Sequence, residues 1–148
     1  MSRRTLPVGV STVVFALLAT SGAATSASTA TPDARRETHP EWGKTSAPNQ
    51  VLKKGCHNYR YNYKLTPPEG DWALETFLVG PGGKRLASGA FAGAFDPEKG
   101  PGTFRICKAT TRYGRFKIKA KLSVQNGPTE YTEGWLPKSH FRLRRPSH

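Results

Sequence analysis

The sequence predicts an all-β fold, a single antiparallel β-sandwich of about seven strands with one disulfide bond. The first observation is periodicity: between residues 51 and 146, nearly every segment alternates apolar and polar residues or has the composition of a turn. The second is that no segment shows the apolar period of a helix. The third is spacing, because short runs separated by turn signals roughly every 8 to 15 residues are typical of sandwiches.

The first three strands are expected between residues 58 and 95. Residues 58–65 (NYRYNYKL) place tyrosines and a leucine on one face and polar residues on the other. Residues 72–79 (WALETFLV) are apolar on both faces, as in a central strand that is covered on both sides. After the turn GPGG, residues 84–95 (KRLASGAFAGAF) are rich in Gly and Ala, so a neighbouring backbone can approach closely.

Four further strands are expected after these. Residues 103–108 (TFRICK) precede the turn TTRYG, and residues 115–124 (RFKIKAKLSV) alternate almost without exception. Residues 129–136 (TEYTEGWL) and 139–145 (SHFRLRR) complete the set. Together the segments predict a domain over residues 51–146, which is long enough for one small hydrophobic core.

Residues 1–30 have the layout of a secretory signal peptide. Paired arginines precede an apolar run from Val8 to Ala19, and small residues follow it. The run is too short for a transmembrane anchor, so the sequence predicts a secreted protein. Residues 31–50 are polar, contain three prolines and predict a flexible leader. Export by the general or the twin-arginine route is left open, and cleavage is expected after Ala24, Ala27 or Ala30.

The chain has two cysteines, Cys56 and Cys107, and an exported protein is expected to pair them. Closing this loop stabilises a fold by about 4 kcal/mol in the chain-entropy model. Both cysteines lie off the apolar parity of their strands, so we expect a disulfide that joins strand ends rather than one buried between the sheets. The four histidines show no ligand spacing relative to the cysteines, and neither a metal nor another cofactor is expected.

The order Cys56, Trp72, Cys107 resembles the Cys–Trp–Cys frame of immunoglobulin-like domains, which implies the same two-sheet architecture. This resemblance covers the folded domain only, and Arg105 stands where that family carries the tyrosine of its corner. The runs WALETFLVGPGG, GRFKIKAKL and GWLP also resemble small secreted proteins of high-GC Gram-positive bacteria, a group with no assigned function. The second resemblance implies an extracellular location and no particular activity.

A row of cations lies on the outer parity of residues 115–124. The chain has a net charge of +13, and no Asp or Glu occurs from Lys99 to Gly127. Removal of the signal peptide would leave 21 Lys and Arg against 10 Asp and Glu. The strand at 139–145 adds arginines on its own outer parity, and two such strands in one sheet would form a basic surface. The candidate anion-binding residues are Arg115, Lys117, Lys119, Lys121, Arg142 and Arg144.

This pattern favours a non-catalytic module that contacts an anionic polymer or cell-envelope component: a teichoic acid, a polysaccharide or, non-specifically, a nucleic acid. The competing interpretation is solubility, because lysines also protect exposed strands from edge-to-edge aggregation. A protein-binding or inhibitor-like domain, with another secreted protein as its partner, is a further alternative. A small basic ribonuclease is the last, with His57, His140 and Glu75 as candidate acid–base residues. No nucleophile elbow, phosphate loop or metal-binding helix accompanies these residues, so no enzyme is expected.

Overall fold

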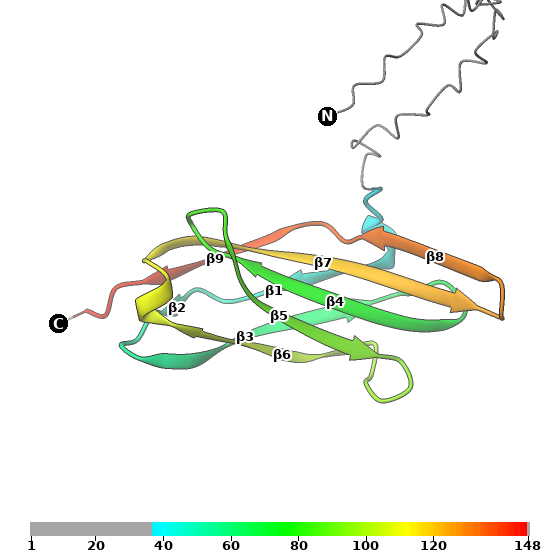
Figure 1. The fold of residues 1–148 in the computed structure, drawn as a ribbon, viewed down its shortest axis with the longest axis horizontal. Coiled ribbons are helices and arrows are strands. Elements are labelled where there is room, and N and C mark those ends of the chain that lie inside the picture. Colours follow the sequence, from blue (N-terminus) through cyan, green and yellow to red (C-terminus); the bar gives the residue numbers. More distant parts are fainter. Residues whose placement is uncertain (1–36, 148) are drawn as a thin grey trace, which may run out of the picture. The chain divides into compact units, whose positions relative to one another are not determined.

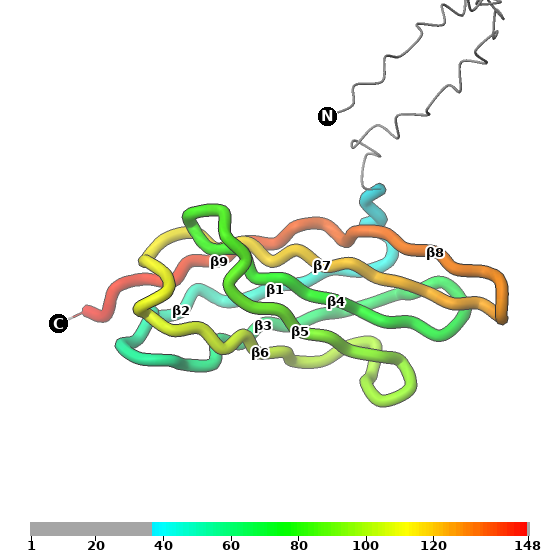
Figure 2. The backbone as a smooth tube through the Cα atoms, in the orientation of Figure 1, coloured from blue at the N-terminus to red at the C-terminus, as the bar shows by residue number. Residues whose placement is uncertain are grey.

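The computed structural model describes residues 37–147, which form an all-β fold of nine strands in two sheets (Figure 1). The expected signal peptide and the leader residues before Glu37 lie outside the described residues. The backbone trace shows strands that run along one common direction, with most connecting loops gathered at their two ends (Figure 2).

One sheet has three antiparallel strands in the order β1–β3–β6. Their bounds are β1 (Gly43–Ser46), β3 (Cys56–Leu65) and β6 (Lys99–Cys107). The alternation of β3 buries one face of the strand, with side chains at most 3% exposed: Tyr59, Tyr61, Tyr63 and Leu65. The opposite face carries polar residues and stays in solvent, as a period of two requires.

The second sheet has six strands. Their bounds are β2 (Gln50–Val51), β4 (Asp71–Val79), β5 (Arg85–Ala92), β7 (Gly114–Asn126), β8 (Glu130–Trp135) and β9 (Ser139–Arg144). The order across the sheet is β2–β9–β7–β4–β5, and β8 pairs with β7 beyond the end of β9. The longest strand is β7, with 13 residues, and it has β4 along one edge and β9 followed by β8 along the other. Among these strands only β2 and β9 pair in parallel.

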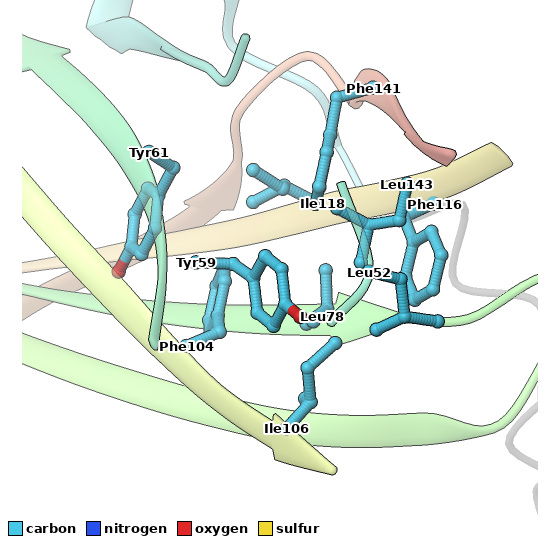
Figure 3. Close-up of a cluster of buried hydrophobic side chains, with 10 residues drawn as sticks. All are labelled: Leu52, Tyr59, Tyr61, Leu78, Phe104, Ile106, Phe116, Ile118, Phe141 and Leu143. Atoms are coloured by element: carbon cyan, nitrogen blue, oxygen red, sulfur yellow. The ribbon is translucent and has the colours of Figure 1, made fainter. Parts of the chain in front are cut away.

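The two sheets face each other across a core rich in aromatic residues. Figure 3 shows one of its two clusters, to which β3, β4, β6, β7 and β9 contribute side chains. Tyr61 stacks on Phe104 with ring centroids 4.3 Å apart. The buried hydroxyl of Tyr61 is 2.7 Å from that of Thr76, which in turn donates to the Gly89 carbonyl at 3.2 Å. The polar tip of this core tyrosine is therefore satisfied, as burial requires.

The sheets curl toward each other along both sides, which gives a half-barrel rather than a flat sandwich. On one side, the hydroxyls of Thr45 in β1 and Ser139 in β9 lie 2.6 Å apart. On the same side, the Gln50 side chain donates to the carbonyl of Arg60 and accepts from its N–H, which ties β2 to β3. On the other side, β5 lies beside β6 without forming a ladder with it.

Ordered structure begins earlier in the chain than the sequence predicts. Residues 40–51 form a short 3-10 helix, η1 (Pro40–Trp42), followed by β1 and β2, where a flexible leader was expected to reach residue 50. Trp42 is only 9% exposed and packs into the second core cluster, which holds this segment on the domain. Strands β1 and β2 are too short to show an apolar period, so the expected set lacked both of them.

The predicted disulfide between Cys56 and Cys107 is present. The two cysteines are register partners at one end of the β3–β6 ladder, so the bond joins neighbouring strands of one sheet, as their parity indicated. Trp72 lies near the other end of the strands, because it pairs with Val124 late in β7 whereas Cys107 precedes β7. The chain therefore has the Cys–Trp–Cys order of immunoglobulin-like domains without their bond between the sheets.

The position of the Tyr61 ring leaves no room for a side chain at Gly102. A Cβ added at Gly102 would overlap the Tyr61 ring, which is 1% exposed and fixed by its bond to Thr76. We therefore predict that Gly102→Ala lowers the free energy of unfolding by about 1–3 kcal/mol through overpacking. Urea denaturation with the disulfide intact measures this change. In the control Gly82→Ala, the new Cβ would meet an Arg112 nitrogen at an ordinary 3.5 Å, and equal midpoints for the two variants would contradict the prediction.

Candidate functional site

The outer face of the six-stranded sheet carries the predicted cations of β7. The inner face of β7 is buried, with no side chain more than 3% exposed: Phe116, Ile118, Ala120, Leu122 and Val124. Because the strand alternates, its cations must point to the opposite face, beside the outer residues of β4, β8 and β9. The register with these three strands decides what each cation meets.

Near the start of β7 the cations lie opposite other basic residues. Arg115 is the register partner of Arg142, and Lys117 is the register partner of His140. The Cβ atoms of such partners lie about 4.5–5.5 Å apart. No carboxylate within residues 37–147 forms an ion pair with Arg115, Lys117 or Arg142. We term Arg115, Lys117, His140 and Arg142 the β7–β9 cluster.

The β7–β9 cluster lowers the pKa of its histidine. Partial desolvation is the largest cause, and the charges of Arg115, Lys117 and Lys138 add to it. The pKa of His140 therefore lies below its ordinary value of 6.5, and the ring is mainly neutral at neutral pH. Since the unfolded chain takes up this proton more readily, His140 contributes stability at higher pH that is lost as the pH falls through 6.5. The positive charges of Arg115, Lys117 and Lys138 thus act on the His140 ring in the same direction as desolvation.

Farther along β7 the cations have partners. The ammonium group of Lys119 lies 4.8 Å from the ring centroid of Trp135. Lys121 forms ion pairs with Glu75 of β4 at 3.1 Å and with Glu133 of β8 at 3.2 Å, and hydrogen bonds to these carboxylates raise the pKa of Lys121. The row of cations that the sequence predicted is therefore divided: Lys121 is neutralised by two carboxylates, whereas the start of the row faces β9.

Arg144 lies beyond the β7–β9 cluster, at the end of β9. Its register partner is Val51 of β2, and its backbone carbonyl accepts a hydrogen bond from the Leu52 N–H at 2.9 Å. The residue is exposed. Its charge is thus placed among the loops at the strand ends rather than over the middle of the sheet.

The two ends of the strands carry opposite charges. One end has ten Lys and Arg and no Asp or Glu, in four segments: residues 52–55, 80–85, 108–115 and 142–147. The other has five Asp and Glu in three loop segments, residues 66–71, 93–98 and 127–130, while Lys44, Lys64 and Lys99 lie on the adjoining strands. We term them the basic end and the acidic end, and the basic end is the one from which the C-terminus leaves in Figure 1.

Contacts between loops hold the basic end together. The Lys108 N–H donates to the Gly55 carbonyl at 2.9 Å, next to the disulfide. The Tyr113 ring lies 4.8 Å from the Lys108 ammonium and 5.4 Å from the Arg145 guanidinium. The sequence-based site did not include these loop cations, because residues in turns have no strand parity that assigns them to a face. The sequence does show that all four segments lack Asp and Glu. This observation points to a basic end only when the order of the strands shows that the four segments lie together.

The candidate acid–base residues of the ribonuclease alternative do not come together. His57 belongs to the three-stranded sheet, and its Nε2 atom is 2.8 Å from a backbone carbonyl oxygen in the loop before β3. Glu75 and His140 share the outer face of the other sheet, but Glu75 is the register partner of Lys121 and His140 that of Lys117. That difference along β7 corresponds to about 13 Å. No two of these three residues are therefore placed for proton transfer between them.

Comparisons with known proteins do not name a family for this chain. No protein-family model matches it, and no curated protein shows significant similarity to it. Within residues 37–147, no three His, Cys, Asp or Glu side chains are grouped so as to hold a metal ion. In the same part of the chain, no helix has the length and apolar character needed to cross a bilayer. The function must therefore be inferred from the geometry of the chain itself.

Lys117 and Lys121 give a matched test of the electrostatics of the β7–β9 cluster. Lys117→Gln removes a positive charge that faces His140, so the pKa of His140 should rise toward its ordinary value. Lys121→Gln removes an equal charge farther along β7, between Glu75 and Glu133, and should leave that pKa nearly unchanged. An NMR pH titration of the His140 ring protons measures both variants. Equal shifts in the two variants, or a fall with Lys117→Gln, would contradict this account.

Proposed function

We propose that the protein is a secreted, non-catalytic binding module that holds an anionic polymer of the cell envelope on the outer face of its six-stranded sheet. The scaffold is immunoglobulin-like in the broad sense that two largely antiparallel sheets pack face to face. The β7–β9 cluster carries the proposal, because basic residues of two neighbouring strands lie opposite each other without a carboxylate partner in the described chain. The signal-peptide pattern of residues 1–30 and the disulfide support the extracellular location.

The β7–β9 cluster destabilises the folded protein when nothing is bound. Like charges directly opposite each other across two strands are destabilising, and Arg115 and Arg142 form such a pair at neutral pH, whereas the His140 ring opposite Lys117 is mainly neutral. A bound anion removes this repulsion and forms charge-assisted hydrogen bonds, which are roughly twice as strong as neutral ones. The guanidinium groups of Arg115 and Arg142 suit paired contacts with the oxygens of a phosphate or carboxylate.

The spacing within the cluster suits a polymer with closely repeated charges. Neighbouring strands lie about 4.8 Å apart, and alternate residues on one strand lie about 7 Å apart. The four residues of the cluster therefore occupy the corners of a small rectangle on the sheet. Teichoic acids, acidic polysaccharides and nucleic acids all repeat an anionic group along a chain, so the cluster would respond to charge and spacing rather than to a sequence of units.

A second row of cations lies on the outer face of the three-stranded sheet. Lys44 and Lys99 are both register partners of Lys64, on either side of it. The β7–β9 cluster is favoured over this row because two of its residues, Arg115 and Arg142, belong to the basic end and because it contains two guanidinium groups. The lysine row supplies a control with the same charge.

The test is retention of the protein on an immobilised polyanion across a salt gradient. Arg115→Gln with Lys117→Gln removes two charges from the cluster, and Lys44→Gln with Lys64→Gln removes two from the other sheet. We predict that the cluster variant elutes at clearly lower salt than the wild type and that the control variant elutes close to it. On duplex nucleic acid, the loss of two contacts should reduce the slope of log K against log salt by about 1.8.

Circular dichroism of both variants verifies that they remain folded. Equal shifts in elution would mean that net charge alone controls retention, which would eliminate the cluster as the site. Retention of the wild type that does not respond to salt would point to an apolar interface with another protein.

One observation favours a protein partner as the second candidate. Phe95 is 89% exposed, on the loop that joins β5 to β6 at the acidic end. The loop is held by hydrogen bonds: the Ala92 carbonyl accepts from the N–H groups of Phe95 and Asp96, and the Asp96 carboxylate accepts from the Ala92 N–H. A firmly held, exposed aromatic is a common anchor at protein interfaces. Phe95→Ala should leave retention on the polyanion unchanged, because the residue lies far from the β7–β9 cluster along the strands.

A further inference from the structure

A cavity of about 360 Å³ opens at the basic end, apart from the β7–β9 cluster. It lies between the turn that joins β4 to β5, residues 80–84, and the loop around η2 (Lys108–Thr110). We term it the turn pocket. Its main lining residues are Lys84, Leu86, Ala109, Thr110, Thr111 and Arg112.

Glycines shape the wall of the turn pocket. The turn is closed by two backbone hydrogen bonds of 3.0 Å each, from the Gly80 N–H to the Lys84 carbonyl and from the Gly83 N–H to the Gly80 carbonyl. Gly83 has φ +80°, a conformation that favours glycine. The Arg112 guanidinium lies across the turn, with one nitrogen 3.5 Å from the place that a Cβ on Gly82 would take. The two walls of the pocket are thus held close together by the fold.

The turn pocket has two cations and no anion in its lining. Lys84 comes from the turn and Arg112 from the facing loop. Neither forms an ion pair with a carboxylate in the part of the chain that the structure describes. The Thr111 hydroxyl lies beside Gly80, 3.4 Å from the place a Cβ would take, and adds a neutral donor. The pocket therefore offers two positive charges and a hydroxyl, with apolar surface from Leu86 and Ala109.

We propose that the turn pocket binds a dianionic phosphoryl group. A phosphate monoester carries a charge of about −1.5 to −2 at neutral pH, which matches the charges of Lys84 and Arg112. A carboxylate or a phosphodiester has a single negative charge and would leave one cation unmatched. The guanidinium fork of Arg112 binds two phosphoryl oxygens, and the Lys84 ammonium and the Thr111 hydroxyl donate to the others.

The volume of the pocket also fits a small phosphate ester. Sites for small molecules begin at about 300 Å³, so a cavity of about 360 Å³ has room for a phosphoryl group and a few carbon atoms. Leu86 and Ala109 supply the apolar surface on which those carbons rest. The terminal phosphate of a polymer and free inorganic phosphate present the same chemistry to the pocket.

This site is separate from the β7–β9 cluster and does not depend on it. The β7–β9 cluster would bind anionic groups that repeat along a polymer, whereas the turn pocket would bind a single dianionic phosphoryl group. Arg115→Gln with Lys117→Gln should therefore leave phosphate binding unchanged. The two proposals can consequently fail independently, and the same set of variants tells which one has failed.

The experiment is an NMR titration of the ¹⁵N-labelled protein with inorganic phosphate and with glycerol 3-phosphate, at constant ionic strength. Saturable shifts are expected for the backbone amides of residues 80–84 and 109–112. Lys84→Gln and Arg112→Gln should each weaken the affinity about tenfold, because each removes a charge-assisted hydrogen bond. Lys54→Gln removes an equal charge from the basic end outside the pocket and should weaken it less than about twofold, because salt screens exposed charges.

Tighter binding of glycerol 3-phosphate than of inorganic phosphate would support the pocket and identify an ester as the source of the phosphoryl group. Equal binding would support the pocket with free phosphate as the source. The proposal is overturned by the absence of saturable shifts, by equal shifts with acetate, or by an equal loss of affinity in Lys54→Gln. Circular dichroism of the variants excludes unfolding as the cause of any loss.

Discussion

The structure depends on the burial of one face of β7. The inner side chains of this strand extend from Phe116 in one core cluster to Val124 in the other, and three strands pair along its edges. Burying a large apolar side chain stabilises a fold by about 1.5–3 kcal/mol. An exposed ion pair contributes about 1 kcal/mol at most. The apolar face therefore determines the orientation of β7, and the cations between these residues must face outward whether or not they find partners.

The neighbouring strands then determine which side chain lies opposite each outward cation of β7. Strand β4 brings Glu75 to Lys121, whereas β9 brings Arg142 to Arg115. The outer face of β7 is basic throughout, but its two halves differ. Near Lys121 the positive charge is neutralised by carboxylates, whereas at Arg115 it faces another positive charge. In the half that holds Arg115, this residue and Arg142 lie directly opposite each other, an arrangement of like charges that is destabilising unless an anion lies between them. The binding function that we propose therefore depends on which strands are paired rather than on the row of lysines alone.

Local alternation made much of the fold predictable from sequence. It located the strands that became β3 to β9, and the parity of Cys56 and Cys107 indicated a bond between strand ends. It did not reveal β1 and β2, because four and two residues are too few for a period and their pairing depends on distant partners. The site was predictable in part: Arg115 and Arg142 do share a surface, but the carboxylates beside Lys121 follow from sheet order, which no local pattern contains. The turn pocket depends on loops that meet only in the folded chain.

The separation of charge along the strands gives the domain an electric dipole parallel to them. Near an extended anionic surface, such a dipole experiences a torque before any contact forms, so that most encounters would begin with the basic end, which includes Arg115 and Arg142, facing the surface. The domain would arrive with its basic end toward the surface and its acidic end, including Phe95, toward the solvent.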